Sequence, residues 1–261
     1  MSDLRYDLAT IGVLWRRDVM RFLRQPSRLA GALGQPVIFW LVIGSGLSPT
    51  FQLPGLAMNY LEFFFPGVIV MVLVFASIFS SISVIDDRTQ GFLQAVITGP
   101  GSRAAMVLGK CFGSTTVALI QASLFLLLAP LAGFDVTQTA WLLLLGAMTL
   151  ASLGLTAMGF LVAWLLDNVQ AYHAIQMVVL VPLWVVSGAM FPPNPGSGAF
   201  MTLMTFNPVS YAVTATRHAF YGMQAPAATV LEVSAAGSML VLAAFATFCL
   251  GCAMIACERK I

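Results

Sequence analysis

Six long stretches of this chain are apolar and contain no Asp, Glu, Lys or Arg. Each is about as long as the ~18 to 20 residues that a helix needs to cross a bilayer. With 59% hydrophobic and 8% charged residues, the chain lacks the polar surface that would cover six such helices in a soluble protein. We therefore expect an all-α integral membrane protein with six transmembrane helices. The predicted spans are Leu29 to Leu47, Phe63 to Ile85, Cys111 to Leu131, Ala140 to Leu166, Ala171 to Met190 and Val233 to Cys257.

The basic residues predict the orientation of these spans. Eleven of the twelve Lys and Arg residues precede span one, lie between spans two and three, or follow span six, and Arg217 is the exception. The positive-inside rule then places both termini in the cytoplasm, which an even number of spans also requires. We expect a multi-pass protein of the cell inner membrane. The basic residues form no aromatic-rich patch, so no nucleic-acid partner is expected.

Residues 1–28 predict an amphipathic helix ahead of the transmembrane domain, which comprises residues 29–261. Apolar side chains recur every three or four residues from Leu4 to Phe22, and the arginines take the other face. This pattern is typical of an interfacial helix on the inner leaflet, with Trp15 at the depth of the lipid headgroups. The alternative is an ordinary solvated lead-in. Pro26 would turn the chain into span one.

The connector between spans two and three, residues 86–103, has an amphipathic centre. Phe92, Leu93, Val96 and Ile97 follow helical spacing and are bounded by an acidic stretch and by Gly99-Pro100-Gly101. The apolar face of so short a helix must be buried against something. The lipid surface and a soluble partner are the two candidates.

The segment before span six, residues 191–232, is apolar in pieces too short to cross a membrane. Because irregular backbone at membrane depth must be satisfied by protein or water, we expect two short re-entrant or interfacial helices on the outer side, broken at Asn207-Pro208. Arg217 in this segment is either a paired or snorkelling arginine at the outer surface or a substrate contact.

Polar residues inside the spans are candidates for a substrate pathway. Ser77 and Ser81 either pack helices together or line the pathway. Gln176 is costly to bury without a partner, so it either lines the pathway or bonds another helix. Cys249 and Cys252 have metal-ligand spacing but no second ligand pair, so we assign them to packing and expect neither metal nor catalytic residues.

Two motifs resemble one family of transporters. The sequence GFLQ-A-VITGP before Arg103 resembles the cytoplasmic connector of ABC exporter permeases of the second type, and NPVSYAVTATRHAFYG resembles the outer motif of the same family. Gln94 stands where relatives often carry glutamate, so it has no charge for a salt bridge to an ATPase. The resemblance implies ATPase-coupling roles for Asp87, Gly91, Phe92, Leu93, Gln94, Val96, Ile97, Pro100 and Arg103, and an outer gate formed by Asn207, Pro208, Tyr211, Arg217 and Gly222.

This resemblance also implies a function and partners. Two copies of the permease would pair around a central pathway, and two copies of a separate cytoplasmic ATPase, carrying ATP and Mg, would drive them. Spans two and five face the partner copy in relatives, which favours Ser77, Ser81 and Gln176 as pathway residues. The cargo would be amphipathic or hydrophobic, of the drug, lipid or glycan type, and would be exported by alternating access. The chain itself contains no G-x-x-x-x-G-K-[ST] phosphate loop, so we expect a transport subunit rather than an enzyme.

Two other classes of function remain as alternatives. A secondary transporter or channel without an ATPase would normally use carboxylates or arginines within the membrane, and the spans as drawn contain none. A membrane-embedded enzyme would need a nucleophile and a base, and neither H-E-x-x-H nor G-x-S-x-G occurs. A membrane-embedded scaffold is the last alternative.

Overall fold

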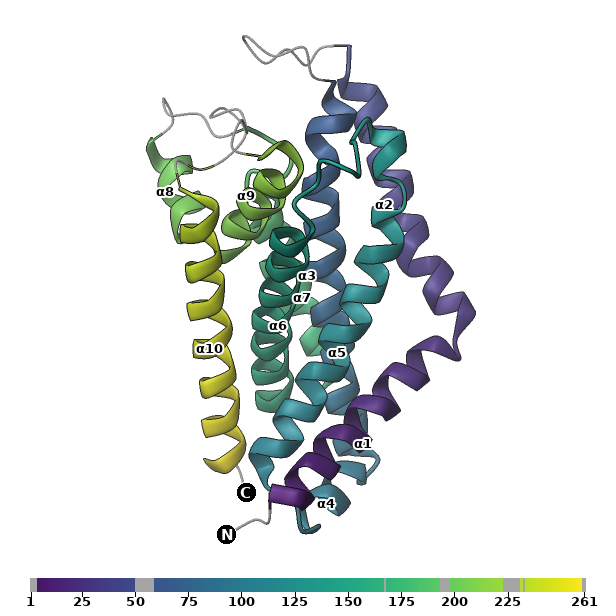
Figure 1. Ribbon diagram of the computed structural model, residues 1–261. Coiled ribbons are helices and arrows are strands. Elements are labelled where there is room, and N and C mark those ends of the chain that lie inside the picture. Colours follow the sequence, from purple (N-terminus) through teal and green to yellow (C-terminus); the bar gives the residue numbers. More distant parts are fainter. Residues whose placement is uncertain are drawn as a thin grey trace.

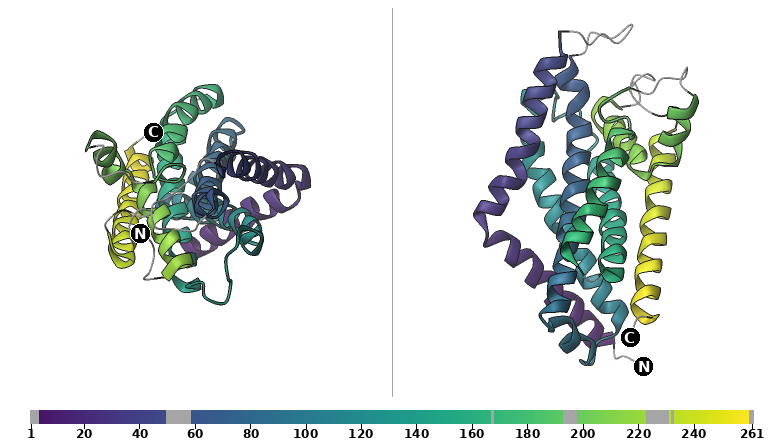
Figure 2. Two further views of the ribbon diagram at one scale, coloured as in Figure 1. Left: turned by 90° about the horizontal axis from the view of Figure 1, so that it is seen from above. Right: turned by 180° about the vertical axis from the view of Figure 1, so that it is seen from behind.

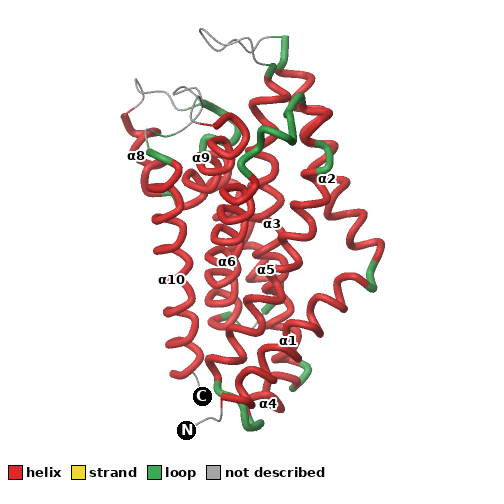
Figure 3. The backbone as a smooth tube through the Cα atoms, viewed as in Figure 1, coloured by secondary structure: helices red, strands yellow, loops and turns green. Residues whose placement is uncertain are grey.

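A computed structural model describes residues 4–49, 59–166, 168–192, 198–222, 231 and 233–259. Within these residues the secondary structure is entirely helical, without strands (Figure 3). The elements are α1 (Leu4–Leu23), α2 (Pro26–Leu47), α3 (Tyr60–Thr89), α4 (Phe92–Ile97), α5 (Arg103–Leu126), the 3-10 helix η1 (Ala129–Ala132), α6 (Trp141–Leu165), α7 (Val169–Val185), α8 (Gly198–Phe206), α9 (Pro208–Tyr221) and α10 (Ala235–Arg259).

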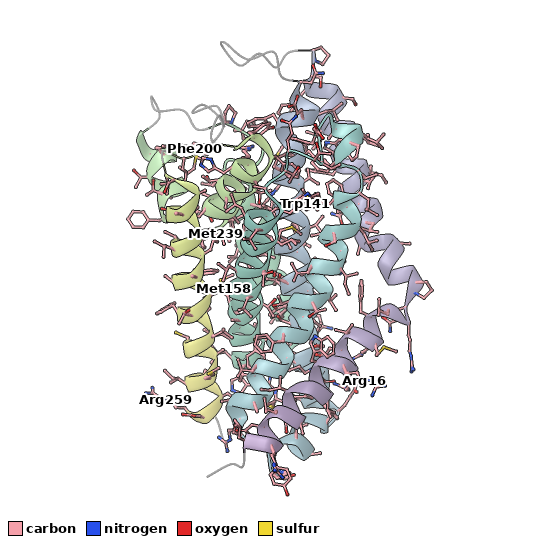
Figure 4. All side chains as sticks on the ribbon, viewed as in Figure 1. Arg16, Trp141, Met158, Phe200, Met239 and Arg259 are labelled. Atoms are coloured by element: carbon pink, nitrogen blue, oxygen red, sulfur yellow. The ribbon has the colours of Figure 1, made fainter. Side chains whose placement is uncertain are left out.

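The long helices form an elongated bundle with both chain termini at one end (Figure 1). This end, the termini end, also carries α1 and α4, whereas α8 and α9 lie at the opposite, far end. Arg16 and Arg259 are toward the termini end, and Trp141 and Phe200 are toward the far end (Figure 4). Helix α3 is central, with 72% of its most apolar part buried, whereas the corresponding value for α2 is 17%. Figure 2 accordingly shows α1 and α2 projecting from one side of the bundle.

Within the described part of the chain, five helices are long and apolar enough to cross a membrane, namely α2, α3, α5, α6 and α10. The stretch from Ala171 to Met190, expected as a sixth span, lies in the 17-residue helix α7 and the turn that follows it, and this helix is shorter than the other five. The helix ends soon after Pro182, which lacks a backbone N–H, and Gly188 then adopts a φ of +82°. This turn packs so closely on α3 that a Cβ at Gly67 would lie 2.7 Å from the carbonyl oxygen of Ala189.

The ends of several helices differ from those expected. Helix α3 continues past Ile85 to Thr89, and α5 begins at Arg103 rather than at Cys111. Both helices therefore carry charged residues beyond the predicted span ends. Asp87 and Lys110 are in ion pairs, and Arg88 and Arg103 donate to backbone carbonyls. Helix α2 begins at Pro26, whose missing N–H costs nothing in the first turn of a helix.

Aromatic packing holds the helices together toward the far end. The Phe65 ring lies 5.1 Å from that of Phe125, and the Phe134 ring lies 4.4 Å from that of Phe220. Trp40 of α2 packs on Phe65 and donates a hydrogen bond of 2.9 Å to the carbonyl of Leu61. The far part of α2 is thereby fixed to α3. Toward the termini end α2 leans away from the bundle and meets α1 at an elbow (Figure 1).

Candidate coupling region, outer cluster and pathway residues

The connector between α3 and α5 is an ordered turn and short helix at the termini end. Gly91 has a φ of +75°, a conformation that favours glycine, and leads directly into α4. Ser102 caps α5 by accepting a hydrogen bond of 3.1 Å from the backbone N–H of Ala105. The backbone N–H of Ser102 donates in turn to Asp7 of α1 at 2.6 Å. Both ends of the connector are therefore fixed by defined local structure.

The apolar face of α4 packs against its own chain. Leu93 is 1% exposed and belongs to the main hydrophobic core, and Phe92, Val96 and Ile97 are partly buried against that core. Lipid and a soluble partner were the two candidates expected to bury this apolar face. Burial against the core of the same chain was not among them. Helical periodicity indicates that a face is buried but does not identify its partner. The exposed surface of the connector consists instead of Thr89, Gln90, Gln94, Ala95, Thr98, Gly99 and Pro100.

A buried ionic cluster lies directly behind the connector. The ammonium of Lys110 on α5 lies 3.0 Å from a carboxylate oxygen of Asp18 on α1 and also contacts Asp87 on α3. Arg17 donates to Asp87 at 2.6 Å. Asp87 is fully buried and Lys110 is 1% exposed. Two cations thus face two carboxylates, the pairing that buried charges require. Asp87, expected at the ATPase contact, therefore lies inside the chain.

Two residues of this cluster on α1 have shifted proton affinities. Burial raises the pKa of Asp18, against the opposing effect of Lys110. The hydrogen bond from Arg17 to Asp87 raises the pKa of the Arg17 guanidinium. The same guanidinium lies 3.9 Å from the centroid of the Phe92 ring, a cation–π contact. Arg17 consequently joins α1 to both α3 and α4.

Two further arginines tie the connector to the ends of distant helices. Arg88 donates to the carbonyl of Trp164 at 2.8 Å and also to that of Leu166, at the end of α6. Arg103 donates to the carbonyl of Glu258 at 3.0 Å, in the last turn of α10. A cation at a helix C-terminus compensates unpaired carbonyls and the helix dipole. Arg103, expected to meet the ATPase, thus contacts α10, and the sequence contains no local signal for that pairing.

The outer motif builds and positions α9 at the far end. The helix break falls at Asn207-Pro208, where the sequence placed it. The Asn207 side chain accepts a hydrogen bond from the N–H of Val209 at 2.9 Å and donates to the carbonyl of Leu183 at 2.5 Å. Tyr211 donates to the carbonyl of Thr205 at 2.8 Å, and Gly222 ends α9 with a φ of +66°.

Arg217 is buried within this outer cluster rather than placed at the surface. Its side chain is 1% exposed and donates to the carbonyls of Phe63 and Ala189 at 3.3 and 3.4 Å. Its guanidinium also lies 4.1 Å from the centroid of the Phe63 ring. The expectation of a surface arginine is therefore wrong. Arg217 joins α9 to the start of α3 and to the turn after α7.

The three proposed pathway residues lie in two different environments. Ser77 is fully buried. The Ser81 hydroxyl donates to the carbonyl of Ser77 at 3.2 Å and to the carbonyl of Thr156 on α6 at 3.4 Å. Gln176 of α7 is 4% exposed and lines a small cavity of about 80 Å³. Both polar atoms of its amide lack a partner among the described residues. Ser80 instead lines a larger cavity of about 460 Å³ between α1, α2, α3 and α5.

This fold defines a class, a multi-pass helical membrane protein with an ordered connector between two of its apolar helices. Within that class, the chain belongs to the ABC-2 type transporter family, whose family profile matches residues 9–221.

Two of three relatives with similar sequences are transport permeases by name, and the third is a nodulation protein. A putative transport permease, ycf38, of Cyanophora paradoxa is 27% identical over 209 residues, covering 78% of this chain and 72% of the relative. The daunorubicin resistance ABC transporter permease protein DrrB1 of Streptomyces coeruleorubidus is 27% identical over 225 residues, covering 82% and 75%. Nodulation protein J of Rhizobium leguminosarum bv. viciae is 25% identical over 216 residues, covering 80% and 81%. The chain is accordingly a transport permease.

Proposed function

We propose that this chain is the permease subunit of an ATP-driven exporter and works by alternating access. Its cargo would be amphipathic or hydrophobic, of the drug, lipid or glycan type, and would leave from the cytoplasm or the inner leaflet. Membership of the ABC-2 family and a drug-resistance permease among the relatives support this proposal. The observation that carries it is the connector, whose buried apolar face and exposed polar face suit a part that is anchored in the permease and contacted from outside.

In the proposed orientation the bundle spans the inner membrane of the cell, and its termini end faces the cytoplasm. Arg16, Arg88, Arg103 and Arg259 all belong to this end, as the positive-inside rule favours. Helix α7 would serve as the sixth span. Its 17 residues extend about 26 Å, slightly less than the ~30 Å hydrocarbon core, and the following turn or local thinning of the bilayer would cover the difference.

The ATPase would contact the exposed face of the connector. In this arrangement Gln94, Thr98 and Pro100 touch the partner, whereas Leu93 and Phe92 anchor α4 to the bundle. Displacement of α4 would be transmitted through Arg17 to α1 and through Asp87 to α3. ATP and Mg would be bound by the partner chain alone, in two copies for each pair of permeases.

A second copy of the permease would complete the pathway. Apolar side chains of α2 and α7 remain exposed in the single chain, among them Val42 at 63% and Val178 at 74%. We assign these faces to lipid and to the homodimer contact. Gln176 is the pathway residue we favour, because its amide has no partner among the described residues. Ser81 is assigned to the packing of α3 against α6. The Ser77 hydroxyl also lacks a partner among the described residues, so Ser77 stays a second pathway candidate.

The proposal is tested by purifying the chain from its native membrane and identifying the associated proteins. We expect a separate chain with a phosphate-loop motif to co-purify, and its ATP hydrolysis to rise when the correct cargo is added to the reconstituted complex. Transport by the permease alone, driven by an ion gradient without ATP, would instead establish a secondary transporter. The buried Asp18–Lys110–Asp87 cluster would then be its natural coupling site.

A further inference from the structure

The cavity of about 460 Å³ is lined by charged residues at one end and by apolar residues of α3 at the other. Along α3 its wall extends from Asp86 to Met71, and 15 residues of helix correspond to about 22 Å. Asp18, Arg21 and Asp86 line the end nearest the termini, and Met71, Val72 and Phe75 line the other end. This polarity runs along the bundle axis, in the same direction as a lipid in the leaflet next to the termini end.

Polar side chains without partners face this cavity from α5. Gln121 is 7% exposed and Ser114 is 4% exposed, and both line the cavity. Neither side chain has a hydrogen-bond partner among the described residues. Neither is among the side chains whose polar atoms are fully buried without a partner, so these polar atoms open into the cavity. They can bond an occupant that offers hydrogen-bonding groups as well as an apolar portion.

The charges at the head of the cavity select the kind of headgroup. Asp18 is already neutralised by Lys110 at 3.0 Å. Asp86 is half-buried and has no partner for its carboxylate among the described residues. Arg21 is 39% exposed and its closest carboxylate, Asp87, is 3.8 Å away. One anion and one loosely paired cation thus remain, which complement a headgroup that carries both a phosphate and an ammonium.

We propose that this cavity binds one phospholipid with a zwitterionic headgroup bearing N–H donors, such as phosphatidylethanolamine. The phosphate lies against Arg21, the ammonium donates to Asp86, and an acyl chain follows Phe75 and Val72 of α3. The assignment to the inner leaflet rests on the proposed orientation of the chain. An anionic lipid would leave Asp86 facing like charge, and a cationic amphiphile would leave Arg21 without an anion.

Two glycines of α2 provide a matched pair of variants for the test. Gly31 lines the cavity, Gly34 does not belong to its lining, and a Cβ at either position meets nothing within 4 Å. Gly31→Phe therefore fills the cavity, and Gly34→Phe adds the same ring to the same helix outside it. Asp86→Asn removes the anion that recognises the ammonium without changing the volume of the side chain.

The experiment is native mass spectrometry of the delipidated chain in detergent, titrated separately with phosphatidylethanolamine, phosphatidylcholine and phosphatidylglycerol. We expect one phosphatidylethanolamine per chain in the wild type and Gly34→Phe, and its loss in Gly31→Phe. Asp86→Asn should weaken this binding about tenfold, the effect of one charge-assisted hydrogen bond, and should tighten phosphatidylglycerol binding, because it removes the like charge that faces the anionic headgroup. Phosphatidylcholine, which lacks the N–H donors, should bind more weakly than phosphatidylethanolamine.

Three results would overturn the proposal. These are equal binding by Gly31→Phe and Gly34→Phe, binding of phosphatidylglycerol as tight as that of phosphatidylethanolamine, and no effect of Asp86→Asn. If Gly31→Phe does not fold, the Asp86→Asn titration decides alone. No ATPase and no transport are involved, so the outcome is independent of whether the chain is an ATP-driven exporter.

Discussion

The Arg17 guanidinium lies 3.9 Å from the centroid of the Phe92 ring while it donates to Asp87 at 2.6 Å. One side chain of the amphipathic helix α1 thus contacts both the connector helix α4 and the end of α3. If an ATPase moves the connector, α1 must follow it or this contact must break. Arg17 is therefore the residue through which we expect the connector and α1 to be coupled.

Replacing Arg17 by lysine should separate this coupling from the stability of the fold. Lysine retains a cation for Asp87 but lacks the planar group that stacks on Phe92. We expect basal ATP hydrolysis of the assembled complex to be unchanged and its stimulation by cargo to fall. Arg16→Lys on the exposed face of α1 is the matched control. Equal stimulation in both variants would show that the stacking contact transmits nothing.

Aspartate at two adjacent positions of α4 should have opposite consequences. Leu93 is 1% exposed, so Leu93→Asp buries an uncompensated charge within the permease and should lower its thermal stability in detergent, by roughly 3–5 kcal/mol. Gln94 is exposed, so Gln94→Asp should leave the melting temperature unchanged and alter only the affinity for the ATPase. A Leu93→Asp protein with wild-type stability would mean that this face of α4 is not anchored to the bundle.

Removing Lys110 alone should destabilise the bundle more than removing the charges of Lys110 and Asp18 together. Lys110→Met removes the buried cation that contacts both Asp18 and Asp87 and leaves only the partly exposed Arg17 and Arg21 near them, at an expected cost of about 3–5 kcal/mol. In the double variant Lys110→Met/Asp18→Asn, Arg17 still neutralises Asp87, so part of the stability should return. Thermal unfolding of the four proteins of this cycle measures the coupling. Additive effects would contradict a shared ionic cluster.

The sequence was sufficient to predict the helices but not the contacts between their charged residues. Uncharged runs locate α2, α3, α5, α6 and α10, and Asn207-Pro208 marks the break before α9, because both signals are local. The ionic cluster joins residues separated by 92 positions, Asp18 and Lys110, and by 70, Arg17 and Asp87. A single sequence carries no local pattern for such pairs, so Arg17 was assigned to the polar face of an interfacial helix and Asp87 to the ATPase contact.

The same limit explains why the surroundings of two further site residues, Leu93 and Arg217, differ from expectation. The periodicity of α4 required a buried face, but its partner, the core around Leu93, consists of residues far away in the chain. Arg217 was placed near the outer surface because its segment is too short to cross the membrane. Its burial depends on Phe63 and Ala189, which come from two other parts of the chain.

The close contact between α3 and the turn after α7 should be sensitive to one methyl group. A Cβ at Gly67 would lie 2.7 Å from the carbonyl oxygen of Ala189, whereas one at Gly46 would meet nothing within 4 Å. We expect Gly67→Ala to destabilise the protein by about 1–3 kcal/mol through overpacking. Gly46→Ala, within α2, should be neutral or slightly stabilising. Thermal unfolding in detergent compares the two, and equal melting temperatures would contradict the tight contact.

The proposed topology can be tested by chemical labelling of single cysteines in a background from which the four native cysteines have been removed. The exposed positions Gln138 and Thr202 lie between α5 and α6 and on α8, and Gln90 is exposed beside α4. With six spans and cytoplasmic termini, an impermeant thiol reagent added outside should label Gln138→Cys and Thr202→Cys but not Gln90→Cys. Thr216→Cys, at 1% exposure, should stay protected from both sides. Labelling of Thr202→Cys only from the cytoplasm would mean that α7 does not cross, because α6 and α8 would then be joined on the same side as the connector. The chain would have five spans, and its C-terminus would lie outside.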